Sequence, residues 1–133
     1  MSDVGDRARE SYESGRALLD SGDLAGAIVQ LEASVDALPH FKTLELLGEA
    51  WLRSGNAQRA VVPLAAATTL NAQVRAPSLL AEALLALGDE VAAHRIARLA
   101  LDRDPNNKKA RKMFASTEAA YLRWSSPGSG SEA

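Results

Sequence analysis

The sequence predicts an all-α protein built from three similar helical hairpins stacked into an α-solenoid. Three observations lead to this prediction. Ala (26 residues) and Leu (19 residues) supply about a third of the 133-residue chain, while Val, Ile, Phe, Tyr and Trp are sparse, which favours helix over strand. Similar residues recur at a spacing of 33. Each period also contains a Gly followed by Asp or Asn, which is typical of a tight turn between two helices.

The repeat is visible in seven columns of the sequence, which is hard to attribute to composition. The turn columns are Gly22, Gly55 and Gly88, then Asp23, Asn56 and Asp89. Small residues form the columns Gly15, Gly48 and Ala81; Ala17, Ala50 and Ala83; and Ala27, Ala60 and Ala93. Large residues form the columns Leu18, Trp51 and Leu84, and Leu19, Leu52 and Leu85.

Each column has a physical role in a helical hairpin. The Gly takes the left-handed conformation that ends the first helix, and the next side chain caps the second helix, contributing about 1 kcal/mol. Small residues allow two antiparallel helices to approach closely, and large ones fill the remaining space. We expect first helices near 7–20, 42–53 and 77–86, and second helices near 24–38, 57–70 and 90–103.

The chain after the third hairpin predicts one more helix, over about 107–124. Its apolar stripe has helical spacing but no Gly turn follows, so we expect a lone helix that covers the exposed side of the third hairpin: Ala110, Met113, Phe114, Thr117, Tyr121 and Trp124. An alternative is that Tyr121 and Trp124 project outward as a docking site. The segment 125–133 is low in complexity, and we expect a flexible tail.

Two prolines lie within predicted helices. Pro63 falls inside the second helix of the second hairpin, where it removes a backbone hydrogen bond, so we expect a kink there. Pro77 falls in the first turn of the next helix, which tolerates proline.

These residues resemble the tetratricopeptide repeat (TPR) family. Its pattern has a small residue at position 8, a large one at 11, Gly at 15, Ala at 20 and Pro near 32. Repeat two, for example, has Gly48, Trp51, Gly55 and Ala60. The resemblance implies a solenoid over 1–124. Its repeats would lie at about 8–40, 41–73 and 74–106, followed by the capping helix.

The sequence departs from the TPR pattern at several positions. The period is 33 rather than about 34, Ser11 and Ser14 replace large residues, and Ala72 replaces the closing Pro of repeat two. Ankyrin repeats also have a period near 33. Their T-P-L-H signature is missing here, so an ankyrin fold is less favoured than a TPR fold.

The sequence offers little for catalysis. It contains no Cys and two His, and it lacks the P-loop, G-x-G-x-x-G, H-E-x-x-H and G-x-S-x-G motifs. We expect His40 to be solvated in a loop, His94 to pack within the fold, and Asp102 and Asp104 to be surface residues. The sequence therefore predicts a protein that is not an enzyme, with no catalytic residues, metal site or cofactor.

Charge and hydropathy limit the partners. The net charge is −2, without the basic excess usual for nucleic-acid binding, so none is expected. The basic cluster Lys108, Lys109, Arg111 and Lys112 could touch an anionic surface, but such runs are usually solvated. No apolar stretch is long enough to span a membrane, and the N-terminus is polar, so we expect no membrane insertion and a cytoplasmic location.

The TPR resemblance implies that the first helix of each repeat lines a concave groove. The residues that would bind a partner there are Arg9, Tyr12, Arg16, Lys42, Glu45, Leu46, Glu49, Arg53, Arg75, Ser78, Leu79, Glu82 and Lys108. Arg9, Lys42, Arg75 and Lys108 recur at a spacing of 33, which predicts a ladder of cations that could contact carboxylates, with Leu46 and Leu79 taking an apolar side chain. Alternatively, the charges pair with one another and stay solvated.

Chaperone-binding TPR domains hold a terminal carboxylate with a clamp of Lys, Asn and Arg. The corresponding positions here are Tyr12, Arg16, Leu46, Arg75 and Leu79, and Arg75 alone keeps the family's character. A chaperone-cofactor role is therefore disfavoured, and the alternative is a weaker contact between Arg75 and a carboxylate.

We interpret the sequence as a non-catalytic adaptor or scaffold that binds a peptide or helix of another protein in the groove. The alternatives are a self-associating structural protein, which would use the capping helix or the open first repeat, and a small secretion-type chaperone. Monomer or weak homo-oligomer is the expected state. The groove charges argue against the chaperone alternative, which requires a largely apolar groove.

Overall fold

The computed structural model describes residues 3–71 and 75–127. Helices form nearly all of this part of the chain, and no strand occurs in it. The helices are α1 (Val4–Ser21), α2 (Leu24–Ala37), α3 (Phe41–Arg53), α4 (Ala57–Leu70), α5 (Ala76–Ala86), α6 (Glu90–Arg103) and α7 (Lys108–Ser125). The all-α prediction and the order of helices are confirmed, and the predicted ends agree to within a few residues.

The turn between the two helices of each hairpin has the predicted chemistry. The glycines that end α1, α3 and α5 have φ of 90°, 86° and 83°, in the left-handed region that favours glycine: Gly22, Gly55 and Gly88. In the first hairpin, the amides of Gly22 and Asp23 donate to the carbonyls of Leu19 and Leu18, at 3.1 and 2.9 Å, which is a Schellman motif. The other two turns repeat this pairing.

The residue after each glycine caps the next helix. A side-chain oxygen of Asp23, Asn56 or Asp89 accepts from the amide three residues later, at 2.9, 3.1 and 3.0 Å. These bonds satisfy one of the free amides with which α2, α4 and α6 begin. The Gly-Asp/Asn columns therefore define the end of one helix and the start of the next, across a connection of two residues in the first hairpin and three in the other two.

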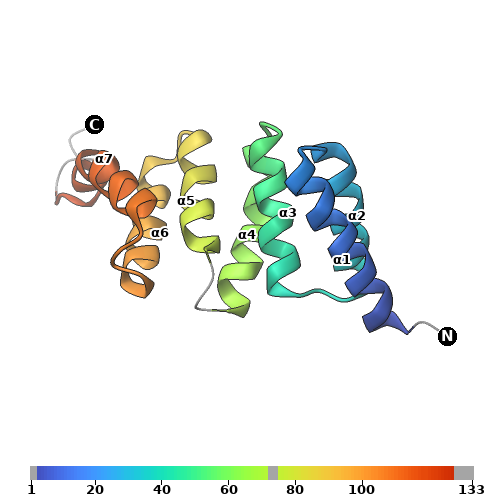
Figure 1. Ribbon diagram of the computed structural model, residues 1–133. Coiled ribbons are helices and arrows are strands. Elements are labelled where there is room, and N and C mark those ends of the chain that lie inside the picture. The colour runs from blue at the N-terminus through green and yellow to red at the C-terminus, as the bar shows by residue number, and fades with distance from the viewer. Residues whose placement is uncertain (1–2, 72–74, 128–133) are drawn as a thin grey trace. The chain divides into compact units, whose positions relative to one another are not determined.

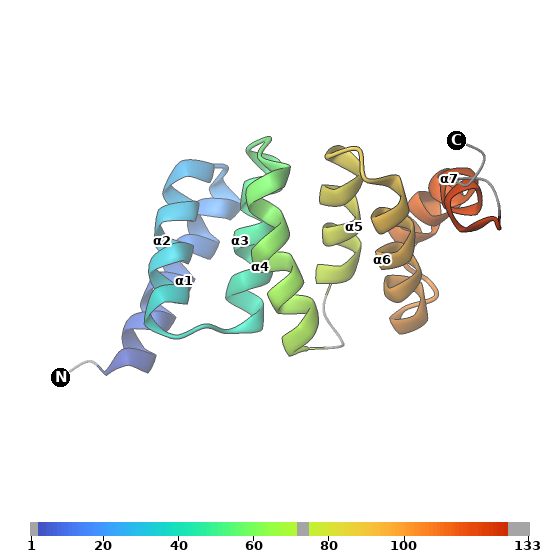
Figure 2. The ribbon, with the colours of Figure 1, turned by 180° about the vertical axis from the view of Figure 1, so that it is seen from behind.

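The chain divides into two compact units, Met1–Ala76 (unit 1) and Pro77–Ala133 (unit 2). Unit 1 consists of two hairpins. Its first helices, α1 and α3, lie side by side at the front in Figure 1, and its second helices, α2 and α4, form the opposite side in Figure 2. Its core includes Leu19, Ala27, Ile28, Leu31 and Leu47.

Two glycines bring the paired helices of unit 1 into close contact. A Cβ added to Gly15 would lie 2.7 Å from Cγ of Leu31, and one added to Gly48 would overlap Cγ of Leu64. Both leucines are fully buried. The small-residue column therefore exists because a leucine from α2 or α4 occupies the space of a side chain on α1 or α3.

The two helical prolines lie where the sequence places them. α4 continues through Pro63, whose side chain is buried, and a kink of the helix axis there stays a prediction. Pro77 is the second residue of α5, in its first turn, as predicted.

Unit 2 contains a hairpin and a final helix. α5 and α6 follow one another through the Gly88 turn, and α7 packs against them in a cluster with Ala81, Ala97 and Met113 at its centre. The predicted stripe of α7 has Ala110, Met113 and Thr117 buried and Phe114 and Tyr121 half-buried, whereas Trp124 at its end is exposed, at 59%. The final helix thus covers apolar surface, as predicted.

His94 of α6 is a packing residue in unit 2, as predicted. Its ring is 5% exposed and stacks on Phe114 and Tyr121, with ring centroids 4.2 and 4.5 Å apart. Its Nδ1 lies 2.9 Å from Oγ1 of Thr117, and that hydroxyl donates to the Met113 carbonyl at 2.7 Å. Because the hydroxyl proton is used, Nδ1 of His94 must carry the proton that joins the two side chains.

Part of the predicted tail, residues 128–133, lies outside the described residues, as does Ala72. The division of the chain into one solenoid over 1–124 stays a prediction. None of the described helices is long and apolar enough to cross a membrane.

Candidate functional site

The predicted partner-binding residues of unit 1 come from α1, from α3 and from the segment before α5. We call the side of unit 1 formed by α1 and α3 the α1/α3 face. Exposed side chains there are Arg9, Arg16, Lys42 and Arg53, while Tyr12, Glu45, Leu46 and Glu49 are half-buried. Tyr12 and Leu46 also pack against the core of unit 1, so they support the face from beneath.

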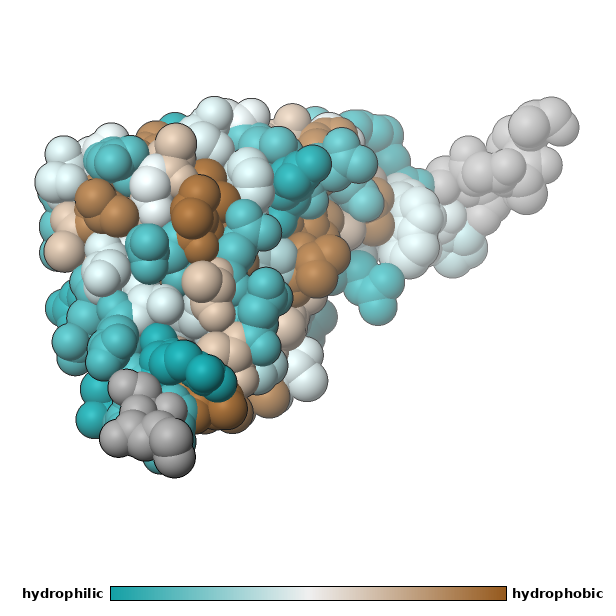
Figure 3. Space-filling model, turned by 90° about the vertical axis from the view of Figure 1, so that its right-hand side faces the viewer, coloured by the Kyte–Doolittle hydropathy of each residue, from teal (hydrophilic) through white to brown (hydrophobic). Residues whose placement is uncertain are grey.

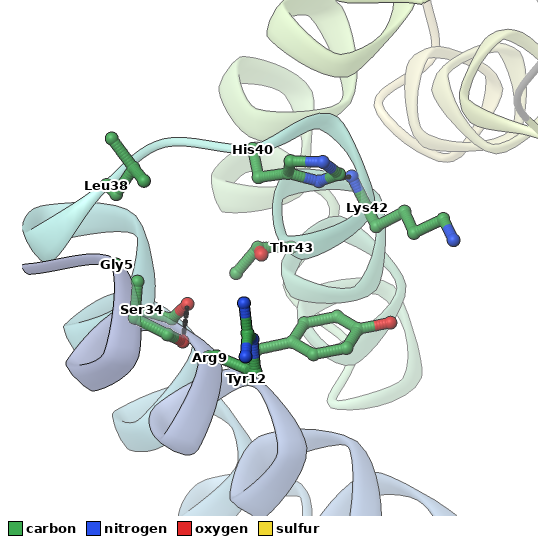
Figure 4. A pocket seen from close by; sticks show the side chains of 9 residues that line it. Gly5, Arg9, Tyr12, Ser34, Leu38, His40, Lys42 and Thr43 are labelled. Carbon is green, nitrogen blue, oxygen red and sulfur yellow. Dashed lines mark hydrogen bonds between the residues drawn. The ribbon is translucent and has the colours of Figure 1, made fainter.

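A pocket of about 320 Å³ opens between α1, the end of α2 and the start of α3. It is lined by Gly5, Ala8, Arg9, Tyr12, Ser34, Leu38, His40, Lys42 and Thr43. Figure 4 shows Arg9 and Tyr12 on the α1 side and His40, Lys42 and Thr43 on the α3 side. The pocket therefore brings together three predicted site residues, Arg9, Tyr12 and Lys42, from different hairpins.

The start of α3 forms one wall of this pocket. His40 is the N-cap, and its Nδ1 accepts from the Lys42 amide at 3.1 Å. In its neutral form the ring therefore carries its proton on Nε2. His40 is exposed, as predicted, and its ring stacks on Phe41 at 4.4 Å between centroids. His40, which sequence analysis placed in a solvated loop, therefore caps α3 and also lines the pocket.

The opposite wall of the pocket is fixed by a hydrogen bond between helices. The hydroxyl of Ser34 on α2 donates to the carbonyl of Ala8 on α1 at 2.6 Å, and Ser34 is fully buried. This bond holds the first half of α1, which carries Arg9 and Tyr12, against α2.

A group of charges lies further along α3. Arg75 donates from Nη2 to Oε1 of Glu49 at 2.7 Å, and its Nε lies 3.6 Å from Oε1 of Glu45. Arg53 lies 3.8 Å from the other oxygen of Glu49 and donates to the carbonyl of Leu19 on α1 at 3.3 Å. Oε1 of Glu45 is buried and accepts no hydrogen bond within the described residues.

These contacts change the ionisation of Arg75 very little in practice. Burial lowers the pKa of its guanidinium, but the hydrogen bond and charge of Glu49 and the charge of Glu45 raise that pKa more, so it lies above its ordinary value. Arg75 therefore stays protonated at neutral pH and serves as a fixed positive charge.

The predicted ladder of cations separates into members with different surroundings. Arg9 and Lys42 line one pocket, and neither forms an ion pair within residues 3–71 and 75–127. Arg75 pairs with the carboxylates of α3. The alternative expectation, that the charges pair with one another, is thus met by Arg53 and Arg75 but not by Arg9 and Lys42.

In unit 2 the predicted site residues are distributed differently. Ser78 and Leu79 are 5% and 6% exposed, so the structure does not present them at the surface. Glu82 accepts from Nζ of Lys109 at 2.9 Å, a contact that sequence analysis did not anticipate. Lys108, the fourth member of the predicted ladder, is the exposed first residue of α7.

No group of three or more His, Asp and Glu side chains that could hold a metal ion occurs among the described residues. His40 and His94 lie in different units. Asp102 and Asp104 are exposed, as predicted, and Asp104 accepts from the amide of Asn106 at 3.1 Å.

Sequence reasoning missed Ser34, Leu38, His40 and Thr43 as members of the pocket. It considered the groove positions of the first helices, whereas this pocket also uses the end of α2 and the first turn of α3. A repeat column could not reveal it, because the pocket depends on which side chains meet across two hairpins.

Comparisons with known proteins identify the fold. The sequence matches no family model and no curated protein. Solved structures do match. The first TPR domain of Spaghetti (RPAP3), bound to the HSP90 peptide SRMEEVD, has a TM-score of 0.81 at 23% identity, covering 87% of this chain and 94% of that one. The TPR domain of Arabidopsis OM64 has a TM-score of 0.82 at 18% identity, with coverages of 88% and 98%.

A third neighbour is the type III secretion chaperone SycD of Yersinia enterocolitica, in complex with a peptide of the translocator YopD. Its TM-score is 0.78 at 18% identity, and the match covers 86% of this chain and 95% of that one. The protein therefore has the all-α fold of tetratricopeptide-repeat domains. The resemblance stated from the sequence is confirmed for the fold.

Proposed function

We propose that this protein is a non-catalytic adaptor whose α1/α3 face binds a segment of another protein. The observation that carries the proposal is the open pocket on this face, which combines apolar walls with two cations, Arg9 and Lys42, that form no ion pair in the described residues. Desolvated pockets with a few oriented polar groups are typical binding sites.

The neighbouring structures support the proposal. Three of them are described with bound peptides: of HSP90 in the RPAP3 domain of Spaghetti, of HSP70 in the second human RPAP3 domain, and of YopD in SycD. At more than three quarters of the matched positions, the residue of this chain differs from that of each of these three structures. Its partner therefore has to be found by experiment.

The alternatives are less well supported. The chaperone alternative calls for a largely apolar groove, and α3 instead presents Glu45, Glu49 and Arg53. Self-association through the first hairpin calls for a continuous apolar surface. On the side shown in Figure 3, apolar patches are separated by polar ones. We retain the expectations of a monomer or weak homo-oligomer, no nucleic acid, and a cytoplasmic location as parts of the proposal.

Affinity capture from native lysate tests the proposal. Wild type is compared with Arg9→Glu/Lys42→Glu and with a control of equal charge change, Arg98→Glu/Lys112→Glu, whose residues are exposed on α6 and α7. We expect a protein retained by wild type and by the control but lost by the first variant, with all three chains equally helical by circular dichroism. Equal retention by the first variant would move recognition away from the α1/α3 face and overturn the proposal.

A further inference from the structure

Thr43, a buried residue in the wall of the pocket between α1 and α3, has a hydroxyl that faces the pocket without a protein partner among the described residues. Thr43 is 3% exposed and lines the pocket, yet its hydroxyl forms no hydrogen bond in the part of the chain that the structure describes. The other three threonines in the described helices each donate to the carbonyl four residues earlier, at 2.7 to 2.9 Å: Thr68, Thr69 and Thr117. Among the described residues, Oε1 of Glu45 is the fully buried side-chain oxygen without a partner, so the Thr43 hydroxyl is reached from the pocket and is available to bond to a ligand there.

The position of Thr43 explains why its hydroxyl is free. It is the third residue of α3, so the residue four positions earlier, Pro39, lies before the helix and its N-cap. Figure 4 shows the hydroxyl between the side chains of His40 and Arg9. The helical N-terminus adds partial positive charge at this point, and the first turn of α3 has no acidic residue to offset it.

The charge of the pocket is distinct from that of its surroundings. Unit 1 contains more acidic than basic residues, yet no acidic side chain lines this pocket. Its ionised groups are Arg9 and Lys42, and His40 offers an N–H donor from Nε2. The pocket is therefore complementary to an anion that brings about two negative charges and several acceptor oxygens.

Resting on the proposed function, we infer that this pocket binds a phosphorylated serine or threonine side chain in the partner's segment. A phosphoryl group carries a charge of about −1.5 to −2 at neutral pH and three acceptor oxygens. In the inferred complex it pairs with Arg9 and accepts from the Thr43 hydroxyl, and the exposed Lys42 side chain, which Figure 4 shows extending away from Arg9, turns inward to meet it. A single carboxylate would leave one cation unbalanced and has one oxygen fewer.

Three synthetic peptide pools, randomised around a fixed phosphoserine, glutamate or serine, test the inference on the full chain. Bound peptides are identified by mass spectrometry, and the affinity of the most enriched one is measured by calorimetry in 0.15 M NaCl. We expect enrichment from the phosphoserine pool alone. Removing the phosphate, or the Arg9→Ala substitution, should weaken binding by about tenfold or more, as for loss of a charge-assisted hydrogen bond.

Thr43→Val is the sharpest variant, because valine has nearly the same shape and removes only a hydroxyl without a protein partner. We expect unchanged thermal unfolding and an affinity lowered by about fivefold. Thr69→Val and Arg98→Ala are matched controls that should leave the affinity unchanged. A structural role of Thr43 would instead lower the unfolding temperature and leave the affinity intact, which would contradict the inference.

The outcomes separate this inference from the proposed function. Equal enrichment of the glutamate pool would overturn the phosphoryl assignment, while peptide binding to the α1/α3 face would stand. Binding that is insensitive to Arg9 and Thr43 but lost in Arg16→Glu would reject the pocket and keep the face. If no pool binds, the inference fails, and the lysate capture then decides the proposed function on its own.

Discussion

Single atoms decide the separation of the helices in unit 1. Gly48 lies where the side chain of Leu64 crosses α3, and Gly15 is related in the same way to Leu31. Neither leucine is exposed, so neither has open space into which it could move. The glycines are therefore required by packing, and their backbone lies in an ordinary helix.

Gly48→Ala should destabilise the protein. Alanine gains about 1 kcal/mol over glycine in a helix, but overpacking of a filled core costs about 1–3 kcal/mol. We expect the free energy of unfolding to fall by up to about 2 kcal/mol, measured by urea denaturation with circular dichroism. In a Leu64→Ala background, the same substitution should become neutral or favourable. Additive effects in this double-mutant cycle would contradict the packing account.

A second residue-scale prediction concerns Thr117 of α7. Thr117→Val keeps the shape of the side chain but leaves the buried Nδ1 proton of His94 without an acceptor. We expect a loss of about 1–3 kcal/mol in the free energy of unfolding. Thr69→Val removes a similar backbone bond at an exposed site and should change stability by less than about 0.5 kcal/mol. Equal effects of the two variants would argue against the His94–Thr117 bond.

At the scale of the element, the hairpin turn depends on one backbone conformation. Gly55 has φ of 86°, and its amide and that of Asn56 satisfy the last carbonyls of α3. No atom would obstruct a Cβ at Gly55, so strain of the backbone is the whole effect of a substitution there. This separates the turn glycines from Gly15 and Gly48.

Gly55→Ala should therefore cost about 1–2 kcal/mol, because alanine is unfavourable in the left-handed region. Gly55→Asn should cost less, since asparagine tolerates this conformation. Thermal unfolding of the two variants beside wild type measures the difference. If the larger asparagine lowered the unfolding temperature more than alanine did, packing and not backbone strain would control this turn.

At the scale of the whole molecule, the distribution of charge argues against nucleic-acid binding. The chain has a net charge of −2. In the basic turn that begins α7, Lys109 pairs with Glu82, and Arg111 donates to the carbonyl of Pro105 at 2.7 Å. Half of the cluster that the sequence suggested as an anionic contact is thus engaged within unit 2.

We expect no binding of labelled single-stranded RNA or duplex DNA in 0.15 M NaCl, measured by fluorescence anisotropy. Weak binding in low salt should fall steeply as salt is added and should disappear in Lys108→Ala/Lys112→Ala, since it would be electrostatic. Binding that persists in 0.15 M NaCl would contradict this prediction.

The sequence by itself determined the fold and the turns of this protein. The Gly-Asp/Asn columns specify left-handed turns and caps locally, and the spacing of small and large residues specifies which helix faces pack, so the helix bounds followed from short-range rules. It also correctly assigned His94 to packing. These features depend on residues near one another in the chain, or on a period that the chain itself displays.

Tertiary structure alone decided which charges are free and which atoms share a pocket. Arg9, Lys42 and Arg75 are equivalent in the repeat, yet Arg75 meets Glu45 and Glu49, while Arg9 and Lys42 line a pocket with Thr43. The same holds for the burial of Leu79, which the TPR resemblance placed on the groove. A repeat fixes the position of a residue within its hairpin, but the partners of a side chain come from neighbouring helices, whose residues the repeat leaves free to vary.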